Sequence, residues 1–269
     1  MNKSDISAIV VLYNEHLKDY ISKLNTYIDF VSYVCILDNS DRFDNQNEVG
    51  CLDIFDVIVE YVNLGGNKGI AYALNSGFEL CKKRNKKYII TLDQDSSFTD
   101  SGINYLNYSF NSELAVIFPR YIDGGVVLIE NEKIQSGAMF SLEHYLKTNG
   151  FNEKYFIDFV DYDMFEQLNN LGYSFYVAND IFLTHHLGTR RITGKAQKEY
   201  TSIAPIRYFY LFRNGFDFFV RYKKNTTLVT LFKLIAKVLF QEEDKRKRFS
   251  YVYKGIIAYL KKEWGKYEE

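Results

Sequence analysis

The first 95 residues alternate between short apolar runs and segments with helical spacing, and this alternation constrains the fold more than any other feature. Apolar runs of strand length cover residues 6–14, 32–40, 56–63 and 87–95, and helical spacing occurs in 16–28 and 69–85. Strands that are apolar on both faces and alternate with helices are typical of a mostly parallel sheet with helices on both faces. We therefore expect an α/β fold, in which ligands bind at the carboxyl ends of the strands.

The chain is large enough for a substantial core, and its composition gives no sign of export. Of its 269 residues, 47% are hydrophobic and 17% aromatic. There is no apolar run of about 18 residues, and the N-terminal stretch lacks a cleavage site, so we expect neither a membrane span nor a signal peptide. Cys35, Cys51 and Cys81 match no zinc spacing and cannot all pair. They favour buried thiols in a reducing cytoplasm.

Polar side chains follow three of the expected strands, at the point where each ends. The three segments are Tyr13-Asn14-Glu15, Asp38-Asn39-Ser40 and Asp93-Gln94-Asp95. Because the carboxyl ends of parallel strands meet at one edge of a sheet, we expect a ligand site at this edge. Asp93 and Asp95 would lie on the same side of an extended backbone, where two carboxylates suit a hard divalent cation that also takes phosphate oxygens.

A glycine-rich segment, residues 63–77, leads from the third strand into a helix. Its spacing matches neither the dinucleotide motif nor the phosphate loop. Gly65, Gly66 and Gly69 would either form a turn that lets the helix pack closely or let backbone amides approach a ligand beside Lys68. The segment alone does not separate these two interpretations.

Residues 155–175 hold a second acidic group, in which aromatic residues are interleaved with carboxylates. Asp158 and Asp161 are three residues apart, which predicts one face of the first turn of a helix, whereas Asp163 points elsewhere. Acids in a first turn are often caps or partners of the helix dipole. Alternatively, the aromatic surroundings would raise the pKa of one carboxylate toward that of a general base.

A third cluster follows another expected strand, in residues 182–191. A lone histidine is usually structural, but here His185 and His186 precede Arg190 and Arg191. Such a group could supply a further metal ligand and contacts to a pyrophosphate. Together, the three clusters suit metal-assisted transfer from a nucleotide-linked donor.

At this point the motifs resemble those of a known family, over roughly residues 6–215. In order, they are VVLYNE, CILDNSD, NLGGNKGIAYALNSG, TLDQDSSF, IQSGAMFSLEHYLKTNGFNEKYFIDFVDYD, THHLG and PIRYFYLFRN. The chain resembles the inverting GT-A-fold glycosyltransferases of family 2, and within them the bacterial rhamnosyltransferase-like group that builds O-antigen, capsule and cell-wall glycans. The FID-x-VD segment and the closing R-Y-x-Y-x-x-RN indicate the rhamnosyl-like branch.

The resemblance implies roles for individual residues on the donor side of the site. The residues implied to contact the nucleotide are Tyr13, Asn14, Glu15, Asp38, Asn67, Lys68 and Asp93. Asp38 would meet the base or ribose, and Asn67 and Lys68 would close over the nucleotide. Asp93 and Asp95 would be the two acids of the DxD motif, holding Mn²⁺ or Mg²⁺ on the donor pyrophosphate, with His185 as a further metal or phosphate contact.

Other roles carried over concern the sugar, the acceptor and the reaction itself. Gly137 would border the sugar pocket, and Asp161 would be the base that deprotonates the acceptor hydroxyl. Many relatives have Glu-Asp where this chain has Val160-Asp161, which leaves Asp158 as a rival base. Asp163 replaces an acid often written Glu on the acceptor side. Four arginines remain as phosphate contacts, the last two of them with a structural alternative: Arg190, Arg191, Arg207 and Arg213.

The expected activity is a metal-dependent, inverting hexosyl transfer, with L-rhamnose from dTDP-rhamnose as the donor sugar. The nucleotide-sugar donor would meet a lipid-linked or polysaccharide acceptor. One alternative keeps the fold but uses UDP-galactofuranose, UDP-galactose or UDP-glucose. Others are a nucleotide-sugar-binding protein without turnover and a nucleotidyltransferase, which would use a triphosphate.

We expect a catalytic domain in residues 1–215, with its nucleotide part in about 1–100 and its acceptor part in about 100–215, and a basic tail in 216–269. Residues 190–269 hold 19 Lys or Arg and 8 Asp or Glu, a balance of +11, whereas the preceding 189 residues hold 14 and 26, a balance of −12. A basic tail on an acidic body suggests an anionic partner, and no nucleic-acid motif accompanies the charge.

The tail predicts two amphipathic helices. The expected apolar stripe, with Lys233 and Lys237 off its centre, consists of Leu228, Leu231, Phe232, Ile235, Val238 and Leu239. These helices would either pack on the catalytic domain or bind anionic lipid. The second interpretation places the enzyme in the cytoplasm, peripherally on the inner face of the plasma membrane.

Overall fold

The computed structural model describes residues 1–53, 56–99, 102–123, 126–127, 133–184, 189–192 and 199–268. These residues form two compact units. Unit 1 comprises Met1–Asn152 and Met164–His186, and unit 2 comprises Glu153–Asp163 and Leu187–Glu269.

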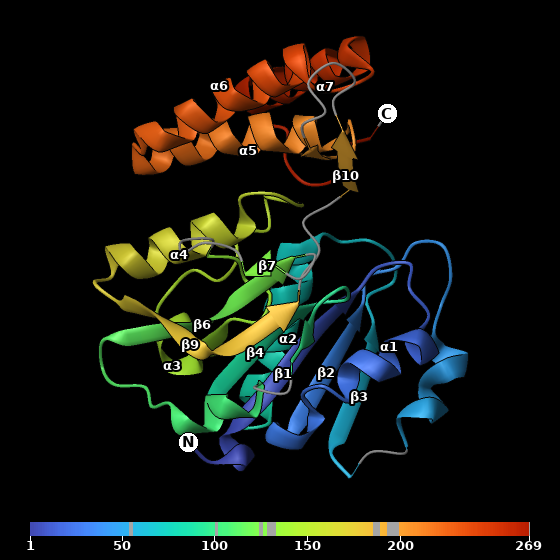
Figure 1. Cartoon of the computed structure of the whole chain (residues 1–269), viewed down its shortest axis with the longest axis vertical. Coiled ribbons are helices and arrows are strands. Elements are labelled where there is room, and N and C mark those ends of the chain that lie inside the picture. Colours follow the sequence, from blue (N-terminus) through green and yellow to red (C-terminus); the bar gives the residue numbers. More distant parts are fainter. Residues whose placement is uncertain are drawn as a thin grey trace. The chain divides into compact units, whose positions relative to one another are not determined.

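Unit 1 is built on one mixed sheet (Figure 1). Its strands are β1 (Ile6–Leu12), β2 (Tyr33–Asp38), β3 (Ile58–Asn63), β4 (Tyr88–Asp93), β5 (Ser97–Phe98), β6 (Leu114–Asp123), β7 (Val126–Val127), β8 (Met139–Ser141) and β9 (Ser174–Thr184). The strand order is β3-β2-β1-β4-β8-β6-β9-β5, and β7 pairs with β6. Strands β3, β2, β1 and β4 run parallel, whereas β8 is antiparallel to both of its neighbours.

Two helices cover the parallel part of the sheet on opposite faces. Strand β1 is buried along its whole length, and its side chains alternate between these faces. Ala8 and Val10 belong to the core cluster that includes the buried side of α1 (Leu17–Leu24). Ile9 instead faces α2 (Ile70–Lys83), where an added Cβ on Gly77 would lie 2.7 Å from Ile9 Cγ2. Gly77 thus permits the close packing of helix on sheet that the sequence suggested for the earlier glycines.

Two further α-helices lie in or reach into unit 1. Helix α3 (Leu142–Tyr145) follows β8, and α4 (Val160–Asn170) begins with residues of unit 2 and ends with residues of unit 1.

Unit 2 is mainly helical. It contains the strand pair β10 (Thr189–Ile192) and β11 (Glu199–Ser202), followed by α5 (Arg207–Tyr222), α6 (Asn225–Phe240) and α7 (Lys245–Lys261). Tyr208, Phe212, Leu231, Val238 and Val252 are buried in one cluster that joins the three helices. The expected division at residue 215 falls inside α5, which is one continuous amphipathic helix from Arg207 to Tyr222.

The predicted α/β class and the predicted tail helices are confirmed. Among the described residues, no helix combines the length and apolar character that crossing a bilayer requires.

Candidate active site

The carboxyl ends of three parallel strands bring the predicted polar residues to one edge of unit 1. In the register of the sheet, Leu12 of β1 pairs with Asp38 of β2, and Val11 of β1 pairs with Asp93 of β4. The two carboxylates therefore flank the segment that follows β1, as the sequence predicted.

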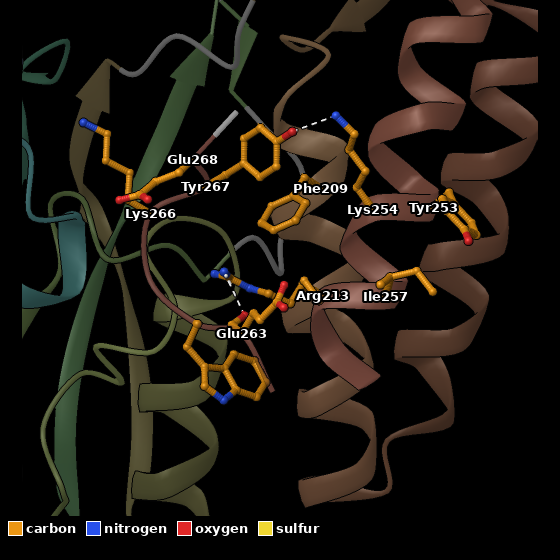
Figure 2. Close-up of a pocket in the computed structure, with 11 residues that line it drawn as sticks. Phe209, Arg213, Tyr253, Lys254, Ile257, Glu263, Lys266, Tyr267 and Glu268 are labelled. Atoms are coloured by element: carbon orange, nitrogen blue, oxygen red, sulfur yellow. Dashed lines mark hydrogen bonds between the residues drawn. The ribbon is translucent and has the colours of Figure 1, made fainter. Parts of the chain in front are cut away.

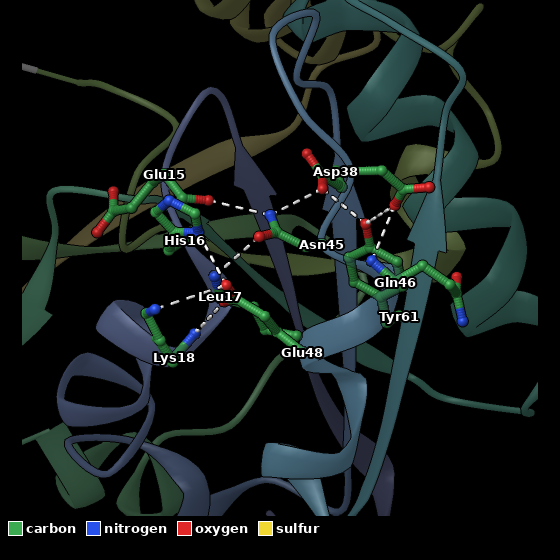
Figure 3. Close-up of polar contacts among 10 residues, drawn as sticks. Glu15, His16, Leu17, Lys18, Asp38, Asn45, Gln46, Glu48 and Tyr61 are labelled. Carbon is green, nitrogen blue, oxygen red and sulfur yellow. Dashed lines mark hydrogen bonds and ion pairs between the residues drawn. The ribbon is translucent and has the colours of Figure 1, made fainter.

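Asp38 is almost completely buried and is held by three donors, of which Figure 3 shows Asn45 and Tyr61. Its Oδ1 accepts the Ser40 backbone N–H at 3.0 Å, and its Oδ2 accepts the Asn45 side-chain amide at 2.9 Å and the Tyr61 hydroxyl at 2.6 Å. Burial, together with the hydrogen bond to Asp38, raises the pKa of Tyr61 above its ordinary value, so Tyr61 stays a neutral donor. Three donors hold the Asp38 carboxylate in one orientation.

Asn45 also ties Asp38 to the start of α1 (Figure 3). Its side-chain amide donates to the Glu15 carbonyl at 3.0 Å, and its Oδ1 accepts the Leu17 backbone N–H at 3.2 Å. The second bond satisfies one of the unpaired amides at the helix N-terminus. The nearby Glu48 side chain accepts the Lys18 backbone N–H and contacts His16 Nδ1, and these bonds lower the pKa of Glu48.

The segment after β1 is held against its neighbours by short hydrogen bonds. The backbone N–H of Tyr13 donates to Gln94 Oε1 at 2.5 Å, and that of Asn14 donates to Ser40 Oγ at 2.7 Å. Asn14 has a φ of 53°, a left-handed conformation that asparagine tolerates better than most residues. Lys23 on α1 donates to both Glu15 Oε1 and the Gln94 carbonyl, which links the ends of β1 and β4.

The glycine-rich segment is organised by two asparagines. The Asn39 side-chain amide donates to Asn67 Oδ1, while Asn39 Oδ1 accepts the Lys68 backbone N–H at 2.7 Å. Gly65 and Gly66 have φ values of 70° and 107°, and a Cβ on either would meet nothing within 4 Å. Their conformation, and not close packing, therefore requires glycine at these two positions.

Asp93 and Asp95 do not share one extended backbone, so this part of the prediction is wrong. Strand β4 ends at Asp93, and Gln94 and Asp95 form a turn in which Ser96 N–H donates to the Asp93 carbonyl. The bonds of Gln94 to Tyr13 and Lys23 favour this turn. Both carboxylates remain at the strand end and two residues apart.

Asp93 is oriented by residues that the sequence interpretation did not select. Gln135 Nε2 donates to Asp93 Oδ1 at 2.6 Å, and the Asp93 backbone N–H donates to Ser136 Oγ at 2.9 Å. Gln135 is 7% exposed, and its Oε1 is buried without a hydrogen-bond partner among the described residues. In this orientation of the side-chain amide, the N–H group of Gln135 faces the Asp93 carboxylate and the Gln135 oxygen has no hydrogen-bond donor among the described residues.

Gly137 directly follows these two residues, at a position where no side chain fits. Its φ is 80°, and an added Cβ would lie 2.7 Å from Leu183 Cδ2 and 2.8 Å from Pro119 Cγ. Its backbone N–H donates to the Thr91 carbonyl at 2.7 Å. Whether Gly137 borders a sugar stays a prediction, but its conformation explains why glycine stands here.

The donor set at the strand end fits a cation that arrives with a ligand. Among the described residues no three His, Cys, Asp or Glu side chains gather into a metal cage. Asp93 and Asp95 would supply two carboxylates, which leaves most of an octahedron to phosphate oxygens and water, the coordination that Mg²⁺ favours. His185 lies outside the described residues, and Arg190 and Arg191 lie in β10.

In unit 2, Asp158 and Asp161 do not lie in one helical turn, which corrects the prediction from their spacing. Helix α4 begins at Val160, and Asp158 and Phe159 precede it with φ values of 66° and 65°. The buried Asn214 side chain donates to the Ile157 and Asp158 carbonyls at 2.8 and 3.0 Å, which fixes this conformation.

The carboxylates of Asp158 and Asp163 are engaged in ion pairs within unit 2, and Asp161 is half-buried. The Asp158 side chain is 5% exposed and binds Arg207, whose Nε donates at 3.1 Å. Asp163 is fully buried and binds Arg221 and the Tyr222 hydroxyl. Asp161, in the first turn of α4, accepts the Tyr162 backbone N–H at 2.9 Å.

Arg213 anchors the end of the chain (Figure 2). It is 1% exposed, and its guanidinium donates to the Gly265 carbonyl at 2.9 Å and to the Lys154 carbonyl at 3.3 Å. Burial lowers the pKa of Arg213 to about 10. Arg213 also lies at a cavity of about 580 Å³, lined among others by Tyr253 and Trp264. These contacts favour the structural alternative for Arg213 within this unit.

The site residues missed from the sequence are Asn45, Tyr61, Gln135 and Ser136. Each is an ordinary polar or aromatic residue: Asn45 and Tyr61 follow Asp38 by 7 and 23 positions, and Gln135 and Ser136 follow Asp93 by 42 and 43 positions. For Gln135 and Ser136 a signal existed, because they precede Gly137 in the QSGAM motif.

Comparisons with known proteins agree with this architecture. A sequence profile described as Glycosyl transferase family 2 matches residues 7–167, more than half of the chain. The dTDP-rhamnosyl transferase RfbF of Shigella flexneri is 26% identical over 291 residues, covering 96% of this chain and 95% of the relative.

Two solved structures share the fold at low sequence identity. The mannosyltransferase PcManGT from Pyrobaculum calidifontis, in complex with GDP-Man and Mn²⁺, has a TM-score of 0.60 at 12% identity, covering 96% of this chain and 88% of that one. GalNAc-T7, solved with UDP, GalNAc and Mn²⁺, has a TM-score of 0.53 at 9% identity, covering 67% of this chain and 43% of that one. The predicted GT-A fold is confirmed, and the chain belongs to glycosyl transferase family 2.

Proposed function

We propose that this glycosyltransferase moves L-rhamnose from dTDP-L-rhamnose to a lipid-linked or polysaccharide acceptor, with inversion at the anomeric carbon. The observation that carries the proposal is the strand register that sets Asp38 and Asp93 on either side of the end of β1. The rhamnosyl donor is supported by the full-length similarity to a dTDP-rhamnosyl transferase.

In this proposal the nucleotide lies along the edge formed by β1, β2 and the glycine-rich segment. Asp38 faces the base or ribose, and its three donors keep the carboxylate in place. Asn67 and Lys68 close over the nucleotide from the segment that Asn39 braces. Tyr13, 43% exposed, offers a ring surface to the ligand.

Asp93 and Asp95 would hold Mn²⁺ or Mg²⁺ at the diphosphate, and Gln135 would keep Asp93 oriented for this task. When bound, the cation supplies positive charge beside the leaving diphosphate, and fixed charges of this kind are usually the largest contribution to catalysis. The protein's part is to present two carboxylates in a fixed geometry at the strand end.

Asp161 is the base that we propose for the acceptor hydroxyl. The Asp158 side chain is 5% exposed and paired with Arg207, whereas Asp161 is half-buried. Proton transfer by a positioned carboxylate contributes about 10²–10⁴-fold to the rate. Attack by the deprotonated hydroxyl breaks the anomeric bond to the diphosphate in one displacement, so no covalent enzyme intermediate forms.

Asp163 and Arg207 would position other residues without contacting the substrates, because each forms an ion pair within unit 2.

We propose that the acceptor is built at the inner face of the plasma membrane, where a peripheral enzyme of the cytoplasm reaches it.

The proposal is tested by a donor screen with purified protein. Binding and slow hydrolysis of dTDP-rhamnose, UDP-galactofuranose, UDP-galactose and UDP-glucose are compared with Mn²⁺, with Mg²⁺ and with EDTA. Preference for dTDP-rhamnose that EDTA abolishes is expected. Preference for a UDP-sugar overturns the rhamnosyl assignment, and consumption of a nucleoside triphosphate with a sugar phosphate indicates a nucleotidyltransferase instead.

A further inference from the structure

Helix α6 has two apolar faces, and only one of them is packed. Leu231 and Val238 are 3% and 0% exposed and join the core of unit 2, with Leu234 and Ile235 partly buried beside them. The stripe predicted from the sequence is therefore mostly the packed face, and its members Phe232 and Leu239 lie elsewhere on the helix.

The second face is exposed from Val229 to Phe240, and we name it the outer face. Its five residues recur every three or four positions and so lie on one side of the helix: Val229, Phe232, Ala236, Leu239 and Phe240. Phe232 is 69% exposed and Phe240 is 80% exposed. Such a row of large apolar side chains on a surface usually marks an interaction site.

Cations lie beside the outer face and at its C-terminal end. Lys233 is exposed and neighbours Phe232, and Lys245, Arg246 and Lys247 are exposed in the first turn of α7. Lys245 Nζ donates to the Leu239 carbonyl at 2.5 Å, which places this basic turn at the end of the outer face.

Two other basic side chains of this region form ion pairs inside unit 2. Lys237 and Arg248 pair with the buried carboxylate of Glu242, at 3.6 and 3.0 Å. The sequence interpretation placed Lys237 at the border of the apolar stripe, but its charge is compensated within the fold. The exposed positive charge comes from Lys233 and the first turn of α7.

The net positive charge of unit 2 favours an anionic partner for the outer face. Unit 2 holds 20 Lys or Arg and 12 Asp or Glu, a balance of +8, whereas unit 1 holds 13 and 22, a balance of −9. Two copies of unit 2 would repel one another through this charge, but a bilayer with anionic headgroups would attract it. A helix that is apolar on one side and flanked by cations contacts such a bilayer in the plane of its interface.

We propose that the outer face of α6 is the surface by which this protein docks on anionic lipid. The aromatic side chains enter the boundary between headgroups and acyl chains, while Lys233 and the first turn of α7 meet the headgroup phosphates. This proposal rests on the proposed function, since a lipid-linked acceptor is held in a bilayer and the enzyme must bind there to reach it. The docking itself requires neither donor nor acceptor.

The test is flotation of the full chain with vesicles of phosphatidylcholine alone or mixed with phosphatidylglycerol. We expect binding to the anionic vesicles that weakens as salt is raised. Replacing both aromatics (Phe232→Ser with Phe240→Ser) should lower the partition coefficient at least about tenfold. Removing charge with Lys245→Gln, Arg246→Gln and Lys247→Gln should lower it about fivefold per cation.

The matched control is Ile58→Ser with Leu171→Ser, which removes two exposed apolar side chains from unit 1 (57% and 49% exposed) and should leave flotation unchanged. Unchanged binding in both α6 and α7 variants overturns the proposal, as does equal binding to neutral vesicles. If the wild type is a dimer and the variant with Phe232→Ser and Phe240→Ser is a monomer, the outer face binds a second copy, and this result also overturns the proposal. Donor binding, measured on the same variants, tests the proposed function separately.

Discussion

Gln135 is expected to set the affinity of the strand-end site for its cation, and Gln135→Glu isolates this effect. The substitution keeps the shape of the side chain but replaces the N–H group 2.6 Å from Asp93 Oδ1 by an oxygen. A hydrogen bond to a charged group contributes about 1.5–3 kcal/mol, and partners of metal ligands typically change metal affinity about 10–100-fold. We therefore expect the apparent affinity for Mn²⁺ to fall by about 10–100-fold.

The assay is donor hydrolysis at varied Mn²⁺ concentration, with the metal and donor dependences fitted separately. Two adjacent carboxylates raise the pKa of one of them, so the variant takes up a proton more readily and recovers a donor toward Asp93. The loss should therefore shrink as the pH falls, which a simple packing defect would not produce. Gln167→Glu is the control, because the Gln167 side chain is also hydrogen-bonded, accepting the Asn149 backbone N–H and donating to the Gly150 carbonyl. Equal metal dependence in Gln135→Glu and wild type would refute the reasoning.

Three further predictions concern the base, a glycine and the tyrosines. Asp161→Asn should lower acceptor-dependent turnover about 10²–10⁴-fold with donor binding retained, and near-normal turnover beside an inactive Asp158→Asn would transfer the role to Asp158. Gly137→Ala should lower the free energy of unfolding by about 2–4 kcal/mol through a strained φ and its contact with Leu183, whereas Gly172→Ala, with a similar φ and an open surrounding, should cost about 1 kcal/mol in the same denaturant titration. Burial raises the pKa of Tyr20, Tyr27 and Tyr105 above the ordinary 10.0. The unfolded chain therefore loses these protons first, and stability should fall as the pH rises above 10.0, measured by circular dichroism against tyrosinate absorbance. Ionisation of all the tyrosines while the protein is still folded at pH 10.0 would contradict it.

The fold could be predicted because its signals are local. A continuous apolar run of about six residues followed by helical spacing is typical of a buried parallel strand and its covering helix. Since parallel strands end at the same edge, Asp38 and Asp93 could be placed together without knowing the strand order. The prediction needed only the direction of the strands, and the structure confirms that direction.

The conformations of Asp95 and Asp158 could not be predicted in the same way, because distant residues determine them. The turn at Asp95 is held by Lys23, 71 positions before Gln94 in the chain, and the left-handed conformation of Asp158 is held by Asn214, 56 positions later. Spacing rules assume that a strand or helix continues to its last expected residue. Asp95 lies just beyond the end of β4 and Asp158 just before the start of α4, so these rules fail where the carboxylates lie.

The two apolar faces of α6 show a related limit at the surface. From sequence alone, an apolar stripe on a helix is assigned to the core, because burial is the usual fate of such a stripe. A helix that is apolar on two sides must leave one of them uncovered when it packs on a single layer, and the spacing does not say which. The structure decides, because Leu231 and Val238 meet α5 and α7 while Phe232 and Phe240 do not. The side that remains exposed is the one beside Lys233 and Lys245, and this coincidence of apolar surface with positive charge is what a lipid interface requires.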